Sequence, residues 1–245
     1  MTKTDKVLLK LYLKQYVREE FISIFRAFKD KNKELKEIMF KNHEENAKNH
    51  YIKLEKEYGN KYNWENTDPA EIHSLIWDKV DDYYELEVLM EHNLVLSLIS
   101  TMSQVFEQQL RSLLYKELNH RLSNVRTKDK IGKFGTDLGK IKDGYKLLGF
   151  EIENTISWPT INELNKLSNS FKHGQGHSFK KLLKMKPKLI KPDLRVDYNI
   201  DSILTTNNEV IFDLNNISFD KYADALIKFW EDFPEYLSNY IDLEK

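Results

Sequence analysis

The chain contains no cysteine, little glycine or proline, and no long uncharged apolar run. Without cysteine there are no disulfides, no thiolate nucleophiles, no iron-sulfur clusters and no Cys-based zinc sites, as is typical of a cytoplasmic chain. Eight Gly and five Pro in 245 residues are too few for a turn-rich β-sandwich. No uncharged apolar run approaches the about 18 residues of a membrane span, and Met1 to Lys14 lacks the cleavage site of a secretory leader. We therefore expect a cytoplasmic, helical protein with no membrane partner.

The chain has no large excess of either charge, but acidic and basic residues are each concentrated in one segment. With 38 basic and 39 acidic side chains, the net charge says nothing about partners. Nine acids and one base occur from Glu65 to Glu91, and eight bases and one acid from Lys172 to Arg195. Either run is explained by a solvated face. The alternatives are a phosphate-binding patch for the basic segment 172–195 and a docking surface for a basic protein in the acidic stretch.

Apolar residues at spacings of three and four predict most of the elements in the first half. They indicate one helix from about Asp5 to Phe28 and a more solvated helix from Lys31 to Tyr58. Asp68, followed by a Pro at the first helical position, indicates the start of a third helix. The uncharged stretch from His92 to Phe106 is typical of a central buried helix.

The second half carries cap signals and one strand pattern. Thr160 and Glu163 match a capping box, and the helix that they open should end at Gly174. Alternation in residues 209–214 predicts a small β hairpin near 196–215, and Ser218 opens a final amphipathic helix. We expect an all-α bundle with an N-terminal helical extension, residues 1–63, and a main helical domain, residues 64–245.

Metal and hydrolase motifs are weak. Among the seven histidines only His173 and His177 have the i, i+4 spacing of a helical metal site, and Gly174 and Gly176 lie between them. Neither a His-Glu-x-x-His nor a Gly-x-Ser-x-Gly motif occurs. We therefore expect no metal and no cofactor.

One helix end combines groups that suit phosphodiester chemistry. His173 falls in the last turn, where the negative end of the helix dipole favours the protonated imidazole. Asn169 lies one turn earlier on the same face, and Lys172 is adjacent. Together they could hold a phosphodiester between a proton donor and an amide. The alternative is a histidine that only caps the last carbonyls of its helix.

These residues resemble the HEPN domains of prokaryotic toxins and defence proteins. Asn169-Ser170-Phe171-Lys172-His173 matches the Asn-x-x-x-His part of the family's Arg-Asn-x-x-x-His motif, and Val105 to Arg111 is similar to its earlier core helix. The resemblance covers roughly Leu86 to Lys184. It implies a helical bundle acting as a symmetric homodimer in bacterial antiviral or toxin-antitoxin systems.

The family's arginine is replaced by Ser168. In catalytic members the resemblance implies metal-independent RNA cleavage, with the histidine transferring a proton and the arginine offsetting charge. Two hypotheses follow: an endoribonuclease with His173, Asn169 and Lys172 at a dimer interface, or a non-catalytic subunit that binds RNA or a protein from the same operon. The expected substrate-binding residues are Arg111, His177, Lys180, Lys181 and Lys184.

Overall fold

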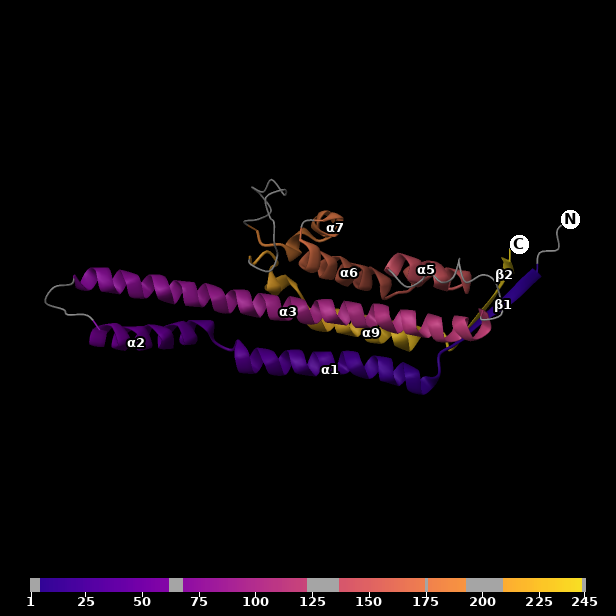
Figure 1. The fold of residues 1–245 in the computed structure, drawn as a ribbon, viewed down its shortest axis with the longest axis horizontal. Helices are drawn as coiled ribbons and strands as arrows, with labels where there is room; N and C mark the ends of the chain where they lie inside the picture. The colour runs from indigo at the N-terminus through magenta and orange to yellow at the C-terminus, as the bar shows by residue number, and fades with distance from the viewer. Residues whose placement is uncertain (1–4, 62–67, 123–136, 175, 193–208, 244–245) are drawn as a thin grey trace. The chain divides into compact units, whose positions relative to one another are not determined.

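A computed structural model describes residues 5–61, 68–122, 137–174, 176–192 and 209–243. Figure 1 shows a predominantly helical chain, as predicted from the composition. The chain divides into two compact units, each made of separated segments. The first comprises Met1–Asp30, Leu98–Asn169 and Ser218–Lys245, and the second comprises Lys31–Ser97 and Ser170–Ile217. The domain boundary expected at residues 63 and 64 falls outside the described residues and stays a prediction.

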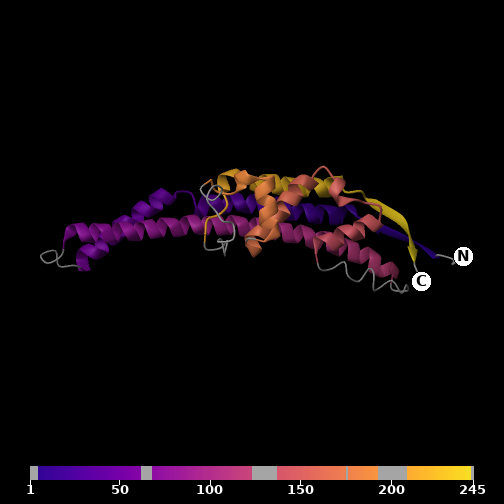
Figure 2. The same ribbon diagram turned by 90° about the horizontal axis from the view of Figure 1, so that it is seen from above.

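The β structure joins the two ends of the chain. Strand β1 (Asp5–Tyr12) pairs antiparallel with β2 (Tyr236–Leu243), in register from Asp5 opposite Leu243 to Tyr12 opposite Tyr236. Figures 1 and 2 show the two strands side by side. The predicted helix from Asp5 was therefore wrong in its first part, and α1 spans Gln15–Met39. Leu9, Leu11 and Leu13 are buried at every second position, which is the period of a strand.

The first unit is centred on the aromatic side chains of α9 (Phe219–Asp232). Trp230 is fully buried and contacts Phe21 and Phe106 at centroid distances of 4.8 and 5.9 Å. The Arg18 guanidinium donates to the carbonyl oxygen of Trp230, in the last turn of α9, and to that of Phe233, which follows the helix. These donations satisfy carbonyls that the helix end leaves unpaired. Ser218 caps the first turn, as predicted, by accepting from the amide of Lys221.

Helix α3 (Pro69–Leu122) is one continuous element of 54 residues that contributes to both units. Asp68 Oδ1 accepts from the amide of Ala70 at 2.9 Å, which confirms the predicted cap. The uncharged stretch is buried along one face, which confirms the central helix. In the described part of the chain, no helix is both long enough and apolar enough to cross a membrane.

The described part of the first unit also contains α5 (Leu138–Leu147), the 3-10 turn η1 (Ile152–Asn154) and most of α6 (Trp158–His173). The capping box predicted for α6 was wrong. Glu163 is buried, and its Oε1 accepts from Lys221 Nζ at 2.6 Å and from Tyr222 Oη at 2.8 Å. Helix α6 begins at Trp158, so Thr160 lies inside it and is not its cap, and the Glu163 carboxylate bonds to α9.

The second unit contains α2 (His43–Lys61), which Figure 1 shows alongside the first part of α3. One buried apolar cluster of this unit comprises Ala47, Leu54, Ile72, Ile76 and Val80. Further elements of this unit are α7 (His177–Met185) and the 3-10 turns η2 (Pro187–Leu189) and η4 (Leu214–Asn216).

The small β element is present, but β1 and β2 form it. Within the expected hairpin at 196–215, residues up to 208 fall outside the described residues. The strand predicted at 209–214 was wrong, because Phe212 makes only an isolated bridge with Ile190. Ile211 and Phe212 are both fully buried, so the side chains do not alternate as they would on a two-stranded ribbon.

Candidate nucleic-acid interface

Helix α6 ends where the sequence predicts. Gly174 adopts a φ of +65°, the left-handed conformation that ends many helices and that glycine adopts without strain. In the last turn Phe171 is buried, whereas Lys172 and His173 are exposed. The turn is thus anchored by an aromatic ring and presents an ammonium and an imidazole to solvent.

The position of the missing arginine is in the core. Ser168 is 1% exposed, and its Oγ lies 2.9 Å from Oγ of Ser100 on α3. A long cation at this position would have to displace a paired, buried hydroxyl. Asn169 is half-buried, and its Nδ2 donates to Oδ1 of Asn165 at 3.1 Å, one turn back on the same helix. The amide predicted to position a phosphate therefore has an internal partner.

Arg111 is held locally on α3. Its Nη2 donates to Oε1 of Glu107 at 2.7 Å, and its buried Nε has no hydrogen-bond partner among the described residues. The guanidinium charge is offset within its own helix. A role for Arg111 beside His173 remains a prediction.

Helix α7 gathers the other predicted binding residues on one face. Phe179 and Leu182 are buried, whereas His177, Lys180, Lys181 and Lys184 are exposed. Successive helical residues are rotated by about 100°, so these four side chains project within an arc of about 100°. The two buried residues point the other way and fix the helix against the second unit. Helix α7 therefore exposes a basic face and is held in place by its apolar face.

The sequence around this face contains no acidic residue. Seven lysines and no acidic residue occur between Lys172 and Lys191. All of them are exposed except Lys191, which is half-buried. We call the exposed side chains of Lys172, His173, His177, Lys180, Lys181 and Lys184 the basic surface. Such an arrangement suits contact with successive phosphates of a nucleic acid.

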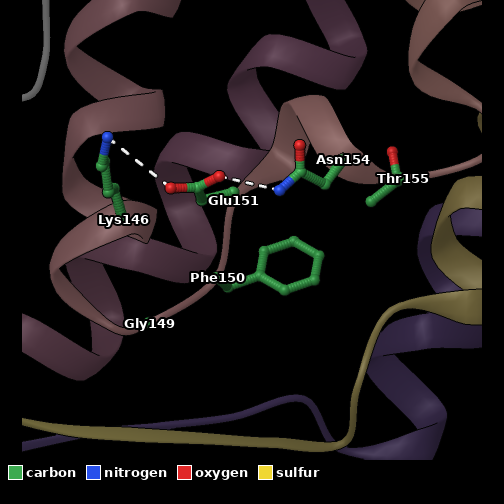
Figure 3. Close-up of a pocket in the computed structure, with 6 residues that line it drawn as sticks. All are labelled: Lys146, Gly149, Phe150, Glu151, Asn154 and Thr155. Atoms are coloured by element: carbon green, nitrogen blue, oxygen red, sulfur yellow. Dashed lines mark hydrogen bonds and ion pairs between the residues drawn. The ribbon is translucent and has the colours of Figure 1, made fainter.

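A hollow of about 520 Å³ lies in the first unit, and none of the predicted site residues lines it (Figure 3). Glu151 in its lining accepts from Asn154 Nδ2 at 2.7 Å and lies 3.6 Å from Nζ of Lys146. Figure 3 shows the ring of Phe150 below these paired groups. The charged groups of this hollow are thus engaged with one another, and we assign it no function.

The second unit also contains a polar cluster that the sequence patterns do not predict. His43 on α2 lies between two carboxylates of α3, with Nε2 2.8 Å from Glu91 and Nδ1 3.3 Å from Glu87. Glu87 also accepts from Asn46 and Tyr83. Burial alone raises the pKa of Glu87, but these hydrogen bonds outweigh it and the net pKa is lowered. In the sequence, Glu87 and Glu91 belong to a long acidic run and do not differ from its other carboxylates. Only their contacts with His43 on α2 distinguish them.

No group of side chains in the described ranges is arranged to hold a metal ion. A scan of protein-family models, a search of curated proteins and a search of solved structures each found no match to the chain. The function of the chain is therefore inferred from the geometry of the basic surface.

Proposed function

We propose that this chain is an RNA-binding subunit that contacts the phosphate backbone through the basic surface. The observation that carries the proposal is the face of α7, where one histidine and three lysines are exposed together while Phe179 and Leu182 are buried behind them. A rigidly anchored helix presents these charges with less loss of entropy on binding than a loop would.

The expected binding is electrostatic and independent of base sequence. Each phosphate that a lysine neutralises releases a counterion, so log K falls with log salt by about 0.7 for each contact with a single strand. Three lysines of α7 should therefore contribute a slope of about 2. The basic surface offers no Phe, Tyr or Trp side chain for base stacking among its six residues. Base preference is thus expected to be slight.

The resemblance to HEPN domains gives the proposal its context, a bacterial defence or toxin-antitoxin system in which the chain acts as a homodimer. Ser168 supports the non-catalytic form, because the position of the family's arginine is buried and bonded to Ser100. The transition-state cation of the motif has no counterpart at that position.

A second candidate is a metal-independent endoribonuclease. One observation favours it: the His173 side chain is exposed in the last turn of α6, beside Lys172 and one turn after Asn169. An exposed imidazole can reach a ribose 2′-hydroxyl or a leaving oxygen, and Lys172 would supply the positive charge. Two copies of this segment across a two-fold axis would complete the site.

The experiment for binding is fluorescence anisotropy with a labelled single-stranded RNA over a series of salt concentrations. The variant Lys180→Gln, Lys181→Gln, Lys184→Gln should bind more weakly, with a salt slope smaller by about 2. The matched control is Lys33→Gln, Lys36→Gln, Lys53→Gln, because it removes the same charge from exposed positions elsewhere. Equal loss in both variants, or no binding by the wild type, would overturn the proposal.

A further inference from the structure

The second unit contains a groove that the basic surface does not use. A hollow of about 600 Å³ lies between α2 and the first part of α3. Each helix lines it with four residues at positions i, i+3, i+4 and i+7, starting from Glu44 on α2 and from Trp77 on α3. Contacts of Tyr51 with Trp77 and of His43 with Glu91 show that the two helices run antiparallel. The groove therefore follows the long axis of a helix pair.

The floor of the groove is apolar and aromatic. Ala47 and Val80 belong to the buried cluster, and Tyr51 packs against it. Trp77 is 54% exposed and Tyr84 is 40% exposed, although both line the hollow. Large aromatic side chains with this much exposed surface in a concave region are typical of binding sites and not of a packed hydrophobic core.

The walls of the groove are held in place without an occupant. Tyr51 Oη lies 3.1 Å from Nδ1 of His73, and its ring packs on Trp77 at a centroid distance of 5.0 Å. Further along the helix pair, His43 bonds to Glu87 and Glu91. A partner would thus meet a formed groove and would not have to order it.

The charges of the groove select the partner. Glu44 and Asp81 line it against the single base Lys48. Asp78 and Glu85 are exposed on the flank of α3 next to Asp81, because residues three and four apart share a face. An acidic rim around an apolar, aromatic floor complements a helix that carries apolar anchors on one face and Lys or Arg beside them.

We propose that this groove binds a basic amphipathic helix of a partner protein, which completes a three-helix arrangement with α2 and α3. The apolar anchors lie on Tyr51, Trp77 and Tyr84. The flanking cations meet Glu44 and Asp81, and a Lys or Arg stem covers the face of Trp77. The proposal does not depend on RNA binding, because it uses none of the residues of the basic surface.

The test uses the full chain and synthetic helical peptides of roughly 18 residues, or five turns. The probe carries Leu at i, i+3, i+4 and i+7 with Lys at the flanking positions. One matched peptide replaces each Lys with Glu, and another scrambles the same composition. Calorimetry should show binding of the Lys peptide, weakened by added salt, and much weaker binding of the other two.

Three protein variants locate the binding. Trp77→Ala should weaken it by about tenfold or more, as truncation of a central aromatic anchor does. The control Ile38→Ala removes a side chain that is 72% exposed elsewhere in the same unit and should bind as the wild type does. The double variant Glu44→Gln, Asp81→Asn retains the apolar floor and should lose most of the salt dependence.

The proposal is overturned by equal binding of the Lys and Glu peptides, by full binding to Trp77→Ala, or by no binding at all. Sedimentation of the protein alone tests whether the groove instead binds a second copy of this chain. Self-association that Trp77→Ala abolishes and Ile38→Ala does not would assign the groove to a second copy of this chain, and it would also overturn the proposal.

Discussion

The backbone amide of Phe212 donates a hydrogen bond of 3.2 Å to Nε2 of His92, across 120 positions of sequence. His92 is fully buried, and its ring stacks on that of Phe212 at a centroid distance of 6.0 Å. Because Nε2 accepts, it carries no proton, and Nδ1 is directed to Oδ1 of Asn93 at 3.4 Å. Protonation would place a second donor against the amide and break the contact.

This contact predicts acid sensitivity. Burial lowers the pKa of His92 to about 4; the bond to Asn93 opposes this, and the charge of Lys191 adds to it. The unfolded chain takes up the proton near pH 6.5, but the folded chain does not until about pH 4. Stability is therefore complete above pH 6.5 and falls by about 3 kcal/mol as pH drops to 4. The free energy of unfolding, measured with urea at a series of pH values, should therefore have a different slope against pH for the wild type and for His92→Gln in this window. Parallel curves would contradict the prediction.

His43 should respond in the opposite direction. Burial lowers its pKa, but the hydrogen bonds of Glu91 and Glu87 outweigh this effect, and the net pKa is raised. Its stabilising contribution is therefore complete below the ordinary value of about 6.5 and is lost as pH rises through the raised pKa. An NMR titration should find the pKa of His43 above that of His92, and Glu91→Gln should lower it. A pKa of His43 that does not change in Glu91→Gln would argue against the pairing.

Gln109 should be sensitive to substitution, and its neighbour should not. Its Oε1 accepts from Trp230 Nε1 at 2.8 Å, and its Nε2 donates to the carbonyl of Phe21 at 3.2 Å. Gln109→Leu leaves the buried indole N–H unpaired and should cost about 1 to 3 kcal/mol. Gln108→Leu, at the exposed adjacent position, should change the free energy of unfolding by less than about 0.5 kcal/mol. Similar losses in both variants would show that the bonding of Gln109 is not the cause.

The ribonuclease candidate depends on His173. If this residue transfers a proton, His173→Ala should reduce RNA cleavage by roughly a hundredfold or more, with no change in melting temperature because the side chain is exposed. Asn169→Ala should have a smaller effect. Cleavage assays on single-stranded RNA and transfer RNA, with and without divalent metal, provide the measurement. Intact RNA in the wild-type reactions would leave the non-catalytic subunit as the interpretation.

Ser168→Arg restores the family's motif in sequence and should nevertheless damage the protein. The side chain would enter the core at the bond to Ser100, where a guanidinium would lose its contact with water. The expected loss is at least about 3 kcal/mol. Ser168→Ala, which removes only the hydroxyl, is the control and should cost about 1 kcal/mol. A stable Ser168→Arg protein with new cleavage activity would contradict this account.

Local signals in the sequence determined most of the helices and several of their ends. Asp68 before Pro69, Gly174 after His173 and Ser218 before α9 act through bonds or backbone angles within a few residues. The face of α7 also follows from the sequence, because helical period alone brings Lys180, Lys181 and Lys184 together. Such local signals cannot identify the partner of a residue when that partner is distant in the sequence.

Only the tertiary structure decided that Asp5–Tyr12 is a strand, since its hydrogen-bond partner is the strand Tyr236–Leu243 at the other end of the chain. The same reason applies to Glu163, which fits a capping box locally and is drawn instead to Lys221 and Tyr222. It applies to Ser168 as well, because the core position opposite Ser100 excludes the arginine that the motif would carry. Helical period and caps are fixed by neighbours in sequence, whereas strand pairing and buried polar bonds are fixed by neighbours in space.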